Sequence, residues 1–426
     1  MQILHIITRY WPGIGGGENY LKEVSERLAA DGHAVTVVTS DADDADLFWN
    51  PAARRVLTRQ ETLNGVRILR FPIRHLPFSP TSYSIWRYLM FWGLAQVPVV
   101  PEPALVWLSR FTPWVPDLRR WLAETGEVFD VVGGMAILHE GFVGAGLRAA
   151  RRWGAPYLLY PLTHLGDQSV PGRDRVSRYY TMRHQRALVR QAAAVVTMTP
   201  TEGAFYERDG LSAERVHVVG AGINPDSVQG GDGQRFRSEH HISGPLVAFL
   251  SAMAYDKGTV HLVEAVRQLW QAGPAVELAL AGTITQPFRG YLNRLPGDVR
   301  QRLRVLGPIS EAEKRDLLAA ADIVAMPSRT DSFGILYLEA WLYRKPVIGA
   351  KAWGMSDVIR DGEDGLLVPF GDVPALAEAI RFLIDHPETR AQMGTRGEAK
   401  VRLRYTWDHC YSLIREVYSR LTNKGD

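Results

Sequence analysis

The sequence predicts an α/β protein of two doubly wound, Rossmann-like domains, each with a parallel sheet covered by helices on both faces. Two observations lead to this fold class. Short runs rich in Val, Ile and Leu alternate with amphipathic helical patterns along almost the whole chain, which is typical of βαβ units. The chain has 426 residues, more than one ordinary hydrophobic core supports, so two domains are expected.

The first half of the chain contains seven predicted strands. They lie at residues 2–8, 34–40, 66–71, 129–134, 156–161, 194–198 and 216–220. Helical segments separate most of them, for example residues 18–30, where Leu21, Val24 and Leu28 share one face. Because the strands are continuously apolar, we expect them to be buried on both faces of a parallel sheet.

A change of composition marks the expected boundary between the domains. Residues 222–244 are rich in Gly, Asp, Ser and Pro without periodicity, and we interpret them as the inter-domain connection. The segment from Trp407 is again helical. We therefore expect an N-terminal domain at 1–222, a second domain at 223–405 and a C-terminal helix at 406–426. The strands of the second domain are predicted at 245–251, 276–282, 303–308, 323–328, 346–349 and 365–369.

Composition limits the partners and the compartment. A formal net charge of +3 gives no indication of a nucleic-acid partner, which would need a clustered basic face. One cysteine, Cys410, excludes an internal disulfide and favours a reducing environment. The N-terminus, MQILHIITRYWPG, is interpreted as a first strand and not as a signal peptide. A cytoplasmic location is expected.

Two segments leave a peripheral membrane contact open. Tyr83–Leu108 is aromatic and apolar, but Arg87, Glu102 and three prolines interrupt it, so it is not a spanning helix. It either packs internally or forms an apolar surface at a membrane or over a substrate cleft, and we expect residues 75–115 to shape an acceptor pocket. The helical segment 172–190 is either a solvated face or a site for anionic lipid at the inner face of the membrane. Its arginines are Arg175, Arg178, Arg183, Arg186 and Arg190.

The stretch 327–341, PSRTDSFGILYLEAW, indicates an anion site. It follows a predicted strand and opens a helix predicted at 332–343, with Asp331 or Ser332 as the N-cap. The free backbone N–H groups at Gly334, Ile335 and Leu336, with the helix dipole behind them, favour a phosphate. Glu339 lies about one turn further in, where its carboxylate could accept hydrogen bonds from sugar hydroxyls. The alternative is a capped helix with a solvated glutamate.

Lys257 strengthens the phosphate hypothesis. It follows the first strand of the second domain and enters the next helix, in AMAYDKGTVHLVEA. A lysine at a helix N-terminus is unfavourable for the helix dipole unless an anion offsets its charge. A diphosphate and the neighbouring carboxylate of Asp256 are the two candidate anions.

These stretches resemble a known family. AYDKG and PSRTDSFGILYLEAWLYRKPVIG are similar to the donor half of the family 4 glycosyltransferases, which have the GT-B architecture of two Rossmann-like domains facing across a cleft. Asp331 and Glu339 match the family's two acidic positions. RYWPGIGGGENYLKEVSERLAADGHAVTVVTS resembles the opening of the same family, with a glycine loop at Gly15, Gly16 and Gly17. The resemblance covers both domains, and we expect the C-terminal helix to return to the first.

The resemblance implies a retaining hexosyltransferase that moves a sugar from a UDP- or GDP-sugar to a hydroxyl acceptor by front-face attack. The acceptor would be a sugar, a lipid-linked sugar or a small alcohol, and no metal or other cofactor would be needed. The acidic run DADDAD at 41–46 is accordingly expected to be solvated.

The resemblance also implies residue roles. Lys257 would bind the diphosphate together with the amides of Gly334, Ile335 and Leu336. Glu339 would bind the ribose, Asp331 the transferred sugar, and the loop from Gly307 to Ile309 the base. Gly15, Gly16 and Gly17 would face the cleft from the acceptor domain. His139 is the preferred sugar-contacting histidine, with His164 as a second cleft group.

Two positions depart from the family pattern. Ala252 stands where an arginine is usual, so one of two diphosphate cations is missing, and Asp331 is shorter than the usual glutamate. They keep open a non-catalytic nucleotide-sugar-binding subunit. A sugar-nucleotide hydrolase or epimerase of the same fold is a further alternative, which the order of motifs fits less well.

Overall fold

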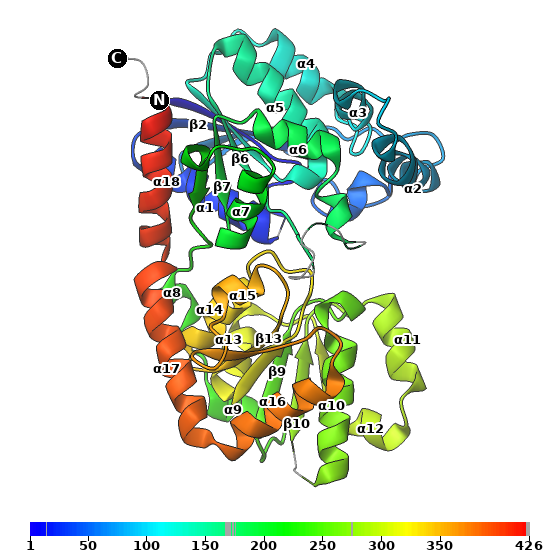
Figure 1. Ribbon diagram of the computed structural model, residues 1–426, viewed down its shortest axis with the longest axis vertical. Helices are drawn as coiled ribbons and strands as arrows, with labels where there is room; N and C mark the ends of the chain where they lie inside the picture. Colours follow the sequence, from blue (N-terminus) through cyan, green and yellow to red (C-terminus); the bar gives the residue numbers. More distant parts are fainter. Residues whose placement is uncertain (14, 167–171, 173, 175, 274–275, 423–426) are drawn as a thin grey trace. The chain divides into compact units, whose positions relative to one another are not determined.

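The computed structural model describes residues 1–13, 15–166, 172, 174, 176–273 and 276–422, and it divides into two compact units (Figure 1). The first unit is Met1–Leu165, Gly172–Gly220 and Tyr411–Asp426, and the second is Gly166–Pro171 and Ala221–Cys410. Each unit has its own sheet with helices around it. The predicted fold class of two doubly wound α/β domains is confirmed.

The sheet of the first unit has eight strands in the order β3-β4-β2-β1-β5-β6-β7-β8. Every neighbouring pair is parallel except the hairpin of β3 and β4. All seven predicted strands are present, and β3 is an addition whose turn at Asn64 and Gly65 has positive φ at both residues. The strands are β1 (Gln2–Ile6), β2 (Ala34–Ser40), β3 (Gln60–Leu63), β4 (Val66–Phe71), β5 (Val131–Met135), β6 (Tyr157–Tyr160), β7 (Ala194–Thr197) and β8 (Val216–Val218).

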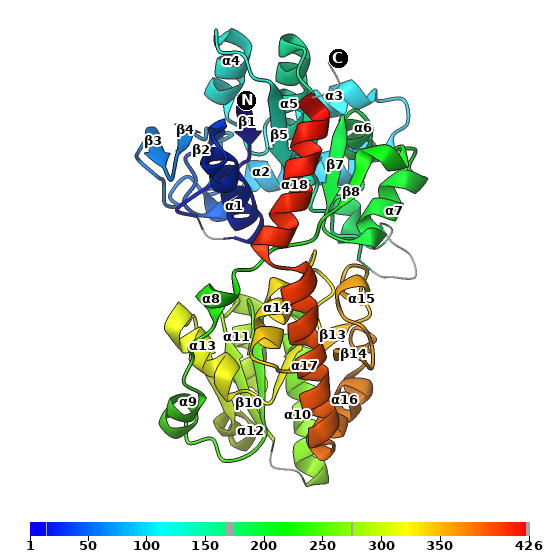
Figure 2. The ribbon, with the colours of Figure 1, turned by 90° about the vertical axis from the view of Figure 1, so that its left-hand side faces the viewer.

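Strand β1 shows how helices cover both faces of this sheet. The His5 side chain bonds at 2.7 Å to Ser25 of α1 (Gly16–Ala30) and at 2.7 Å to Tyr418 of α18 (Trp407–Thr422). Leu4 and Ile6 point the other way, into the core closed by α4 (Pro116–Glu124) and α5 (Glu140–Trp153). Figure 2 shows α1 and α18 side by side. The C-terminal helix therefore packs on the first unit.

The sheet of the second unit has six parallel strands in the order β11-β10-β9-β12-β13-β14. They are β9 (Leu246–Leu250), β10 (Glu277–Ala281), β11 (Leu303–Gly307), β12 (Ile323–Met326), β13 (Val347–Ala350) and β14 (Gly365–Val368). All six match predicted strands. The helices are α8 (Pro225–Val228), α9 (Gly233–Glu239), α10 (Thr259–Ala272), α11 (Gln286–Arg294), α12 (Gly297–Arg302), α13 (Glu311–Ala320), α14 (Ile335–Leu342), α15 (Met355–Val358), α16 (Val373–Asp385) and α17 (Pro387–Arg404).

The segment 222–244 is more structured than its composition indicated. It contains α8 and α9, and α9 packs against α13. Phe236 is buried, and Arg235 forms an ion pair with Asp316 at 2.5 Å. The segment therefore belongs to the second unit and is not a bare linker.

The segment 172–190 is also different from the single helix predicted. A 3-10 turn covers Ser177–Tyr179, α6 covers Arg183–Arg190, and Arg175 lies outside the described residues. Arg183 donates to the carbonyls of Ala95 and Val97, and Arg186 and Arg190 pair with Asp209. These three arginines stabilise the first unit internally instead of forming one free cationic face.

The aromatic segment folds into α2 (Thr81–Tyr88), a short π-helix and α3 (Glu102–Leu108). Phe91 is buried and stacks on Tyr179 with 3.8 Å between ring centroids. Tyr88 and Trp107 remain 63% and 52% exposed. Among the described residues, no helix has both the length and the apolar character that crossing a membrane requires.

The contact between His5 and Tyr418 generates a prediction on stability. Burial lowers the pKa of His5 to about 3, so its ring is neutral and needs a partner at each nitrogen. Tyr418→Phe would leave one buried nitrogen without a partner, and we expect a loss of about 1–3 kcal/mol in the free energy of unfolding. Tyr411 lies on the same helix as Tyr418, and its hydrogen bond to Asp31 is only part-buried, so Tyr411→Phe should cost less. Urea unfolding measures both variants, and equal losses would contradict the assignment.

Candidate functional site

In each sheet, the candidate residues follow the two central strands at which the strand order reverses. In the second sheet β9 pairs with β12, and in the first sheet β1 pairs with β5. Strand order reverses at these pairs, and ligands of doubly wound sheets bind at the carboxyl ends of such strands. Lys257 follows β9 and Asp331 follows β12, while Gly15 follows β1 and His139 follows β5.

Lys257 and Asp331 lie together after β9 and β12. The Lys257 Nζ atom is 2.6 Å from Asp331 Oδ1, and the two side chains are 23% and 19% exposed. Gly258 lets the two segments that carry these side chains approach each other, because a Cβ at this position would lie 2.3 Å from the carbonyl oxygen of Pro327. Its φ of 77° also favours glycine. The carboxylate considered for Lys257 was Asp256, but its carboxylate partner in the structure is Asp331.

Helix α14 begins at Ile335, not at Ser332 as predicted. Its N-cap is Gly334, in the left-handed region with φ 78° and ψ 59°, and no side chain caps it. Asp331 and Ser332 are therefore not the N-cap, because the loop after β12 continues to Gly334 in a conformation that only glycine adopts easily. Within the described part of the chain, no partner is found for the backbone N–H groups of Ile335 and Leu336. This first turn can accept an anion.

Glu339 lies in the middle of α14, one turn after Ile335, and its side chain is mostly buried. Its Oε1 atom accepts a hydrogen bond from Lys314 of α13 at 3.1 Å. Burial raises the pKa of Glu339, and the nearby Lys314 ammonium partly offsets that rise. The Oε2 atom is buried and has no hydrogen-bond partner among the described residues. A buried carboxylate oxygen in that state can accept a ligand hydroxyl.

Arg329 is a neighbouring cation that the sequence did not indicate. Its Nε and Nη2 atoms donate to Asp256 Oδ1 at 2.8 and 2.5 Å, and its backbone N–H donates to the Asp256 carbonyl. The side chain is 41% exposed. Ala252 is exposed after β9 and supplies no charge. Two ion pairs thus join the segments after β9 and β12. The cation of one pair, Lys257, follows β9, and the cation of the other, Arg329, follows β12.

The loop predicted to hold a base begins at the end of β11. Gly307 has a φ of 72°, and its carbonyl accepts a hydrogen bond from Gly282 at 2.7 Å. Ile309 is partly exposed just beyond it. Since β11 lies at the edge of the sheet, these residues are separated from β12 by β10 and β9.

In the first unit, the glycine loop opens α1. Gly15 is the N-cap, and a Cβ at Gly17 would lie 2.9 Å from the Leu162 side chain of the loop after β6. A Cβ at Gly16 would meet no atom within 4 Å. Arg9 pairs with Glu18 at 2.7 Å beside this loop. Gly17 therefore packs closely against Leu162, while Gly16 leaves open space.

The two predicted histidines follow β5 and β6. The His139 ring lies edge-on to Phe48 with 5.2 Å between centroids. Burial and the nearby Arg87 guanidinium lower the pKa of His139 to about 4, so it is neutral near pH 7. His164 stacks on Tyr180 at 4.5 Å. A neutral His139 ring can both donate and accept a hydrogen bond.

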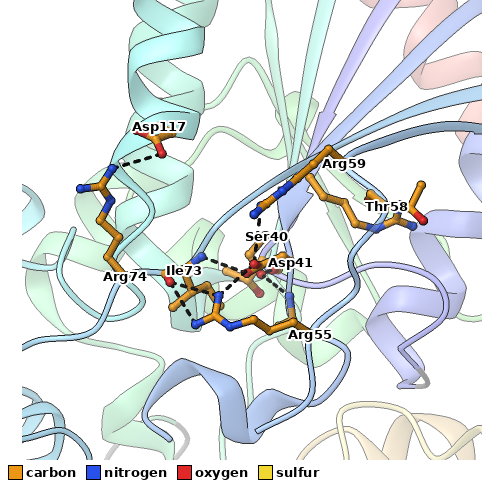
Figure 3. Close-up of polar contacts among 11 residues, drawn as sticks. Ser40, Asp41, Arg55, Thr58, Arg59, Ile73, Arg74 and Asp117 are labelled. Atoms are coloured by element: carbon orange, nitrogen blue, oxygen red, sulfur yellow. Dashed lines mark hydrogen bonds and ion pairs between the residues drawn. The ribbon is translucent and has the colours of Figure 1, made fainter. Parts of the chain in front are cut away.

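The acidic run at 41–46 is solvated only in part: Asp46 is exposed and Asp43 and Asp44 are partly exposed, but Asp41 is buried. Asp41 is 1% exposed at the end of β2, and Figure 3 shows Arg55 and Arg59 converging on its carboxylate. The Arg55 Nη1 atom is 2.9 Å from Asp41 Oδ2, and the Ile73 N–H donates to Oδ1 at 2.9 Å. The buried charge of Asp41 is compensated by arginine, which holds the start of this run at the carboxyl end of β2.

Two models of known protein families match this sequence and together span most of the chain. The model described as "Glycosyl transferase 4-like domain" matches residues 15–222, and the one described as "Glycosyl transferases group 1" matches residues 232–400. The chain belongs to the family 4-type glycosyltransferases. This confirms the resemblance of both halves to that family, in the expected order.

Curated glycosyltransferases of the same type are moderately similar. The alpha-D-kanosaminyltransferase of Streptomyces kanamyceticus is 29% identical over 344 residues, which are 76% of this chain and 88% of that protein. The D-inositol 3-phosphate glycosyltransferase of Xylanimonas cellulosilytica is 26% identical over 431 residues, 97% of this chain and 94% of that protein.

Solved structures agree with the fold of these glycosyltransferases. HepE of Anabaena in complex with UDP superimposes with a TM-score of 0.72 at 20% identity, covering 99% of this chain and all of that one. Sucrose-phosphate synthase of Thermosynechococcus elongatus gives a TM-score of 0.71 at 18% identity, covering 99% of each chain. The likeness establishes the GT-B type of fold.

Among the described residues, no cluster of three or more His, Cys, Asp or Glu side chains could hold a metal ion.

The lowered pKa of His139 predicts how stability depends on pH. In the unfolded chain this imidazole takes up a proton near its usual pKa of 6.5, whereas in the folded chain it stays neutral down to about pH 4. Stability is therefore lost as the pH falls through this window. We expect His139→Gln to lose stability less steeply than the unmodified protein, as measured by urea unfolding from neutral pH downward. Parallel pH profiles would contradict the buried, neutral state.

Proposed function

We propose that this glycosyltransferase is retaining and transfers a hexose from a UDP- or GDP-sugar to a hydroxyl acceptor. The observation that carries the proposal is the pairing of Lys257 with Asp331 at 2.6 Å after neighbouring strands β9 and β12. The uncapped turn of α14 follows directly. The donor class is supported by a GDP-mannose-dependent relative from Corynebacterium glutamicum, 34% identical over 38% of this chain, and by HepE, solved with UDP-glucose.

In this proposal the second unit holds the donor. Lys257 and the amides of Gly334, Ile335 and Leu336 bind the diphosphate, whose charge grows as the glycosidic bond to the sugar breaks. An ammonium group and a helix N-terminus stabilise that charge, as a metal ion does in other transferases, so no metal is required. Glu339 accepts a hydrogen bond from the ribose through its Oε2 atom.

The remaining roles concern the two sugars and the base. Asp331 contacts hydroxyls of the transferred sugar and orients the Lys257 ammonium. Gly307 and Ile309 contact the base. The acceptor is held by the first unit, with Gly15, Gly16 and Gly17, the neutral His139 ring and His164 as its contacts. The departing phosphate takes the proton of the acceptor hydroxyl on the same face, which leaves the anomeric configuration unchanged.

The reaction is tested by following nucleoside diphosphate with and without a candidate acceptor. Transfer predicts its release only when acceptor is present, together with a product of the same anomeric configuration as the donor. Release without acceptor indicates a hydrolase, and binding without release indicates a non-catalytic subunit. A product of inverted configuration would contradict retention.

Lys257→Ala should weaken donor binding by at least about tenfold, since it removes a charge-assisted hydrogen bond to phosphate. Lys351→Ala is the matched control, because Lys351 belongs to the same unit and its side chain is half exposed, 3.9 Å from Asp361. Isothermal titration with UDP and GDP measures both. Undiminished binding by Lys257→Ala would show that the diphosphate lies elsewhere.

Arg329 is proposed as the second cation in place of the one missing at Ala252. Arg329→Ala should lower nucleotide affinity about tenfold, and Arg329→Lys should recover part of it because a charge remains. Asp256→Asn removes the partner of Arg329 but leaves the guanidinium, so it should retain affinity. If Asp256→Asn and Arg329→Ala lose affinity equally, the pair only holds the loop in place.

A further inference from the structure

Three arginines of the first unit converge without carboxylate partners. They are Arg110, which follows α3, Arg119 of α4 and Arg148 of α5, and we call them the arginine triad. Arg119 donates to the carbonyl of Gly141 at 3.1 Å. Arg148 forms no hydrogen bond or ion pair within the described part of the chain, and the buried Nε atom of Arg110 has no acceptor there. This contrasts with Arg186 and Arg190, which share Asp209.

The three guanidinium groups are close enough to repel one another. Burial, and then the charges of Arg148 and Arg110, lower the pKa of Arg119 to about 9. Within the described residues, no carboxylate raises the pKa of Arg119 in return. Holding like charges together without a counter-ion costs free energy, which an anion would recover.

Small residues of α5 let the arginines of the triad approach this helix closely, and a cavity lies beside two of them. A Cβ at Gly141 would lie 2.9 Å from Arg119 Nη2, and one at Gly144 would lie 3.6 Å from Arg148 Nη1. Between α4 and α5 is a cavity of about 230 Å³, which Arg119 and Arg148 line together with Arg152. On its other side Arg148 borders a second cavity of about 230 Å³, lined also by Arg151 and by Glu102. Glu102 is 4.0 Å from Arg190.

The third arginine is held in place by an aromatic ring. The guanidinium carbon of Arg110 lies 3.8 Å from the centre of the half-exposed Trp107 ring. The ring covers one face of the guanidinium, and a stacked guanidinium can still donate hydrogen bonds from its edge to an oxyanion. The triad thus combines one stacked, one hydrogen-bonded and one unpartnered guanidinium.

We propose that the arginine triad binds a phosphate group, either free or in the headgroup of an anionic phospholipid. Two or three guanidinium groups around one phosphate are a recurring way to recognise it. The triad lies in the first unit and shares no residue with the donor site proposed above. It does not depend on the transfer reaction.

The test compares Arg148→Gln with Arg120→Gln. Arg120 is the matched control, since it is exposed on α4 next to Arg119 and lies 3.8 Å from Asp117. Arg148 has no partner to lose, so both variants should fold with unchanged melting temperatures. Vesicles of phosphatidylcholine, with and without phosphatidylglycerol, are the lipid probe. Inorganic phosphate, titrated into a Lys257→Ala background, is the free probe.

If the triad binds a headgroup, Arg148→Gln should weaken binding to the anionic vesicles about fivefold while Arg120→Gln leaves it unchanged. If it binds free phosphate, the same contrast should appear in the titration and not with vesicles. Equal effects of the two substitutions, or no binding of either probe by the unmodified protein, would overturn the proposal. Arg119→Gln repeats the test from the other helix.

Discussion

The close approach of Gly258 to the carbonyl of Pro327 is the constraint on which the candidate donor site depends. No other residue fits there without displacing the backbone, because a Cβ would lie 2.3 Å from the oxygen. The contact joins the segment after β9 to the segment after β12 and sets Asp256 against Arg329 and Lys257 against Asp331. Folding therefore fixes the two cations before any ligand binds, which reduces the reorganisation that a charged ligand would require.

Both units place their chemistry by the same topological rule but with different electrostatics. In the second unit the switch between β9 and β12 carries charged groups and the bare first turn of α14. In the first unit the switch between β1 and β5 carries glycines and the neutral ring of His139. The charged groups of the second unit suit an anionic donor, and the uncharged groups of the first unit suit a hydroxyl acceptor. Both units have the same type of fold, so the fold itself does not explain this difference. It comes from the charge and burial of the side chains at each switch point.

The sequence predicted what local pattern determines and missed what tertiary contacts determine. Continuous apolar runs located thirteen strands, and the Asn64-Gly65 turn could also have located β3. The start of α14 was wrong because Asp331 and Ser332 are good caps locally, whereas Asp331 instead pairs with Lys257, 74 residues away. Nothing near Arg329 or Asp41 in the sequence shows their partners, which come from other loops. The roles assigned to the site residues remain predictions.

The distribution of paired and unpaired arginines separates scaffold from candidate surface. Basic and acidic residues are nearly equal in number, 49 against 46, so composition alone identifies no anion site. The arginine-rich segment 172–190 was the obvious candidate, yet Arg183, Arg186 and Arg190 are held by carbonyls and by Asp209. The arginine triad comes from three separate elements and forms no cluster in the sequence. A cationic site of this kind depends on tertiary structure, because its arginines come from separate elements and none of them meets a carboxylate among the described residues.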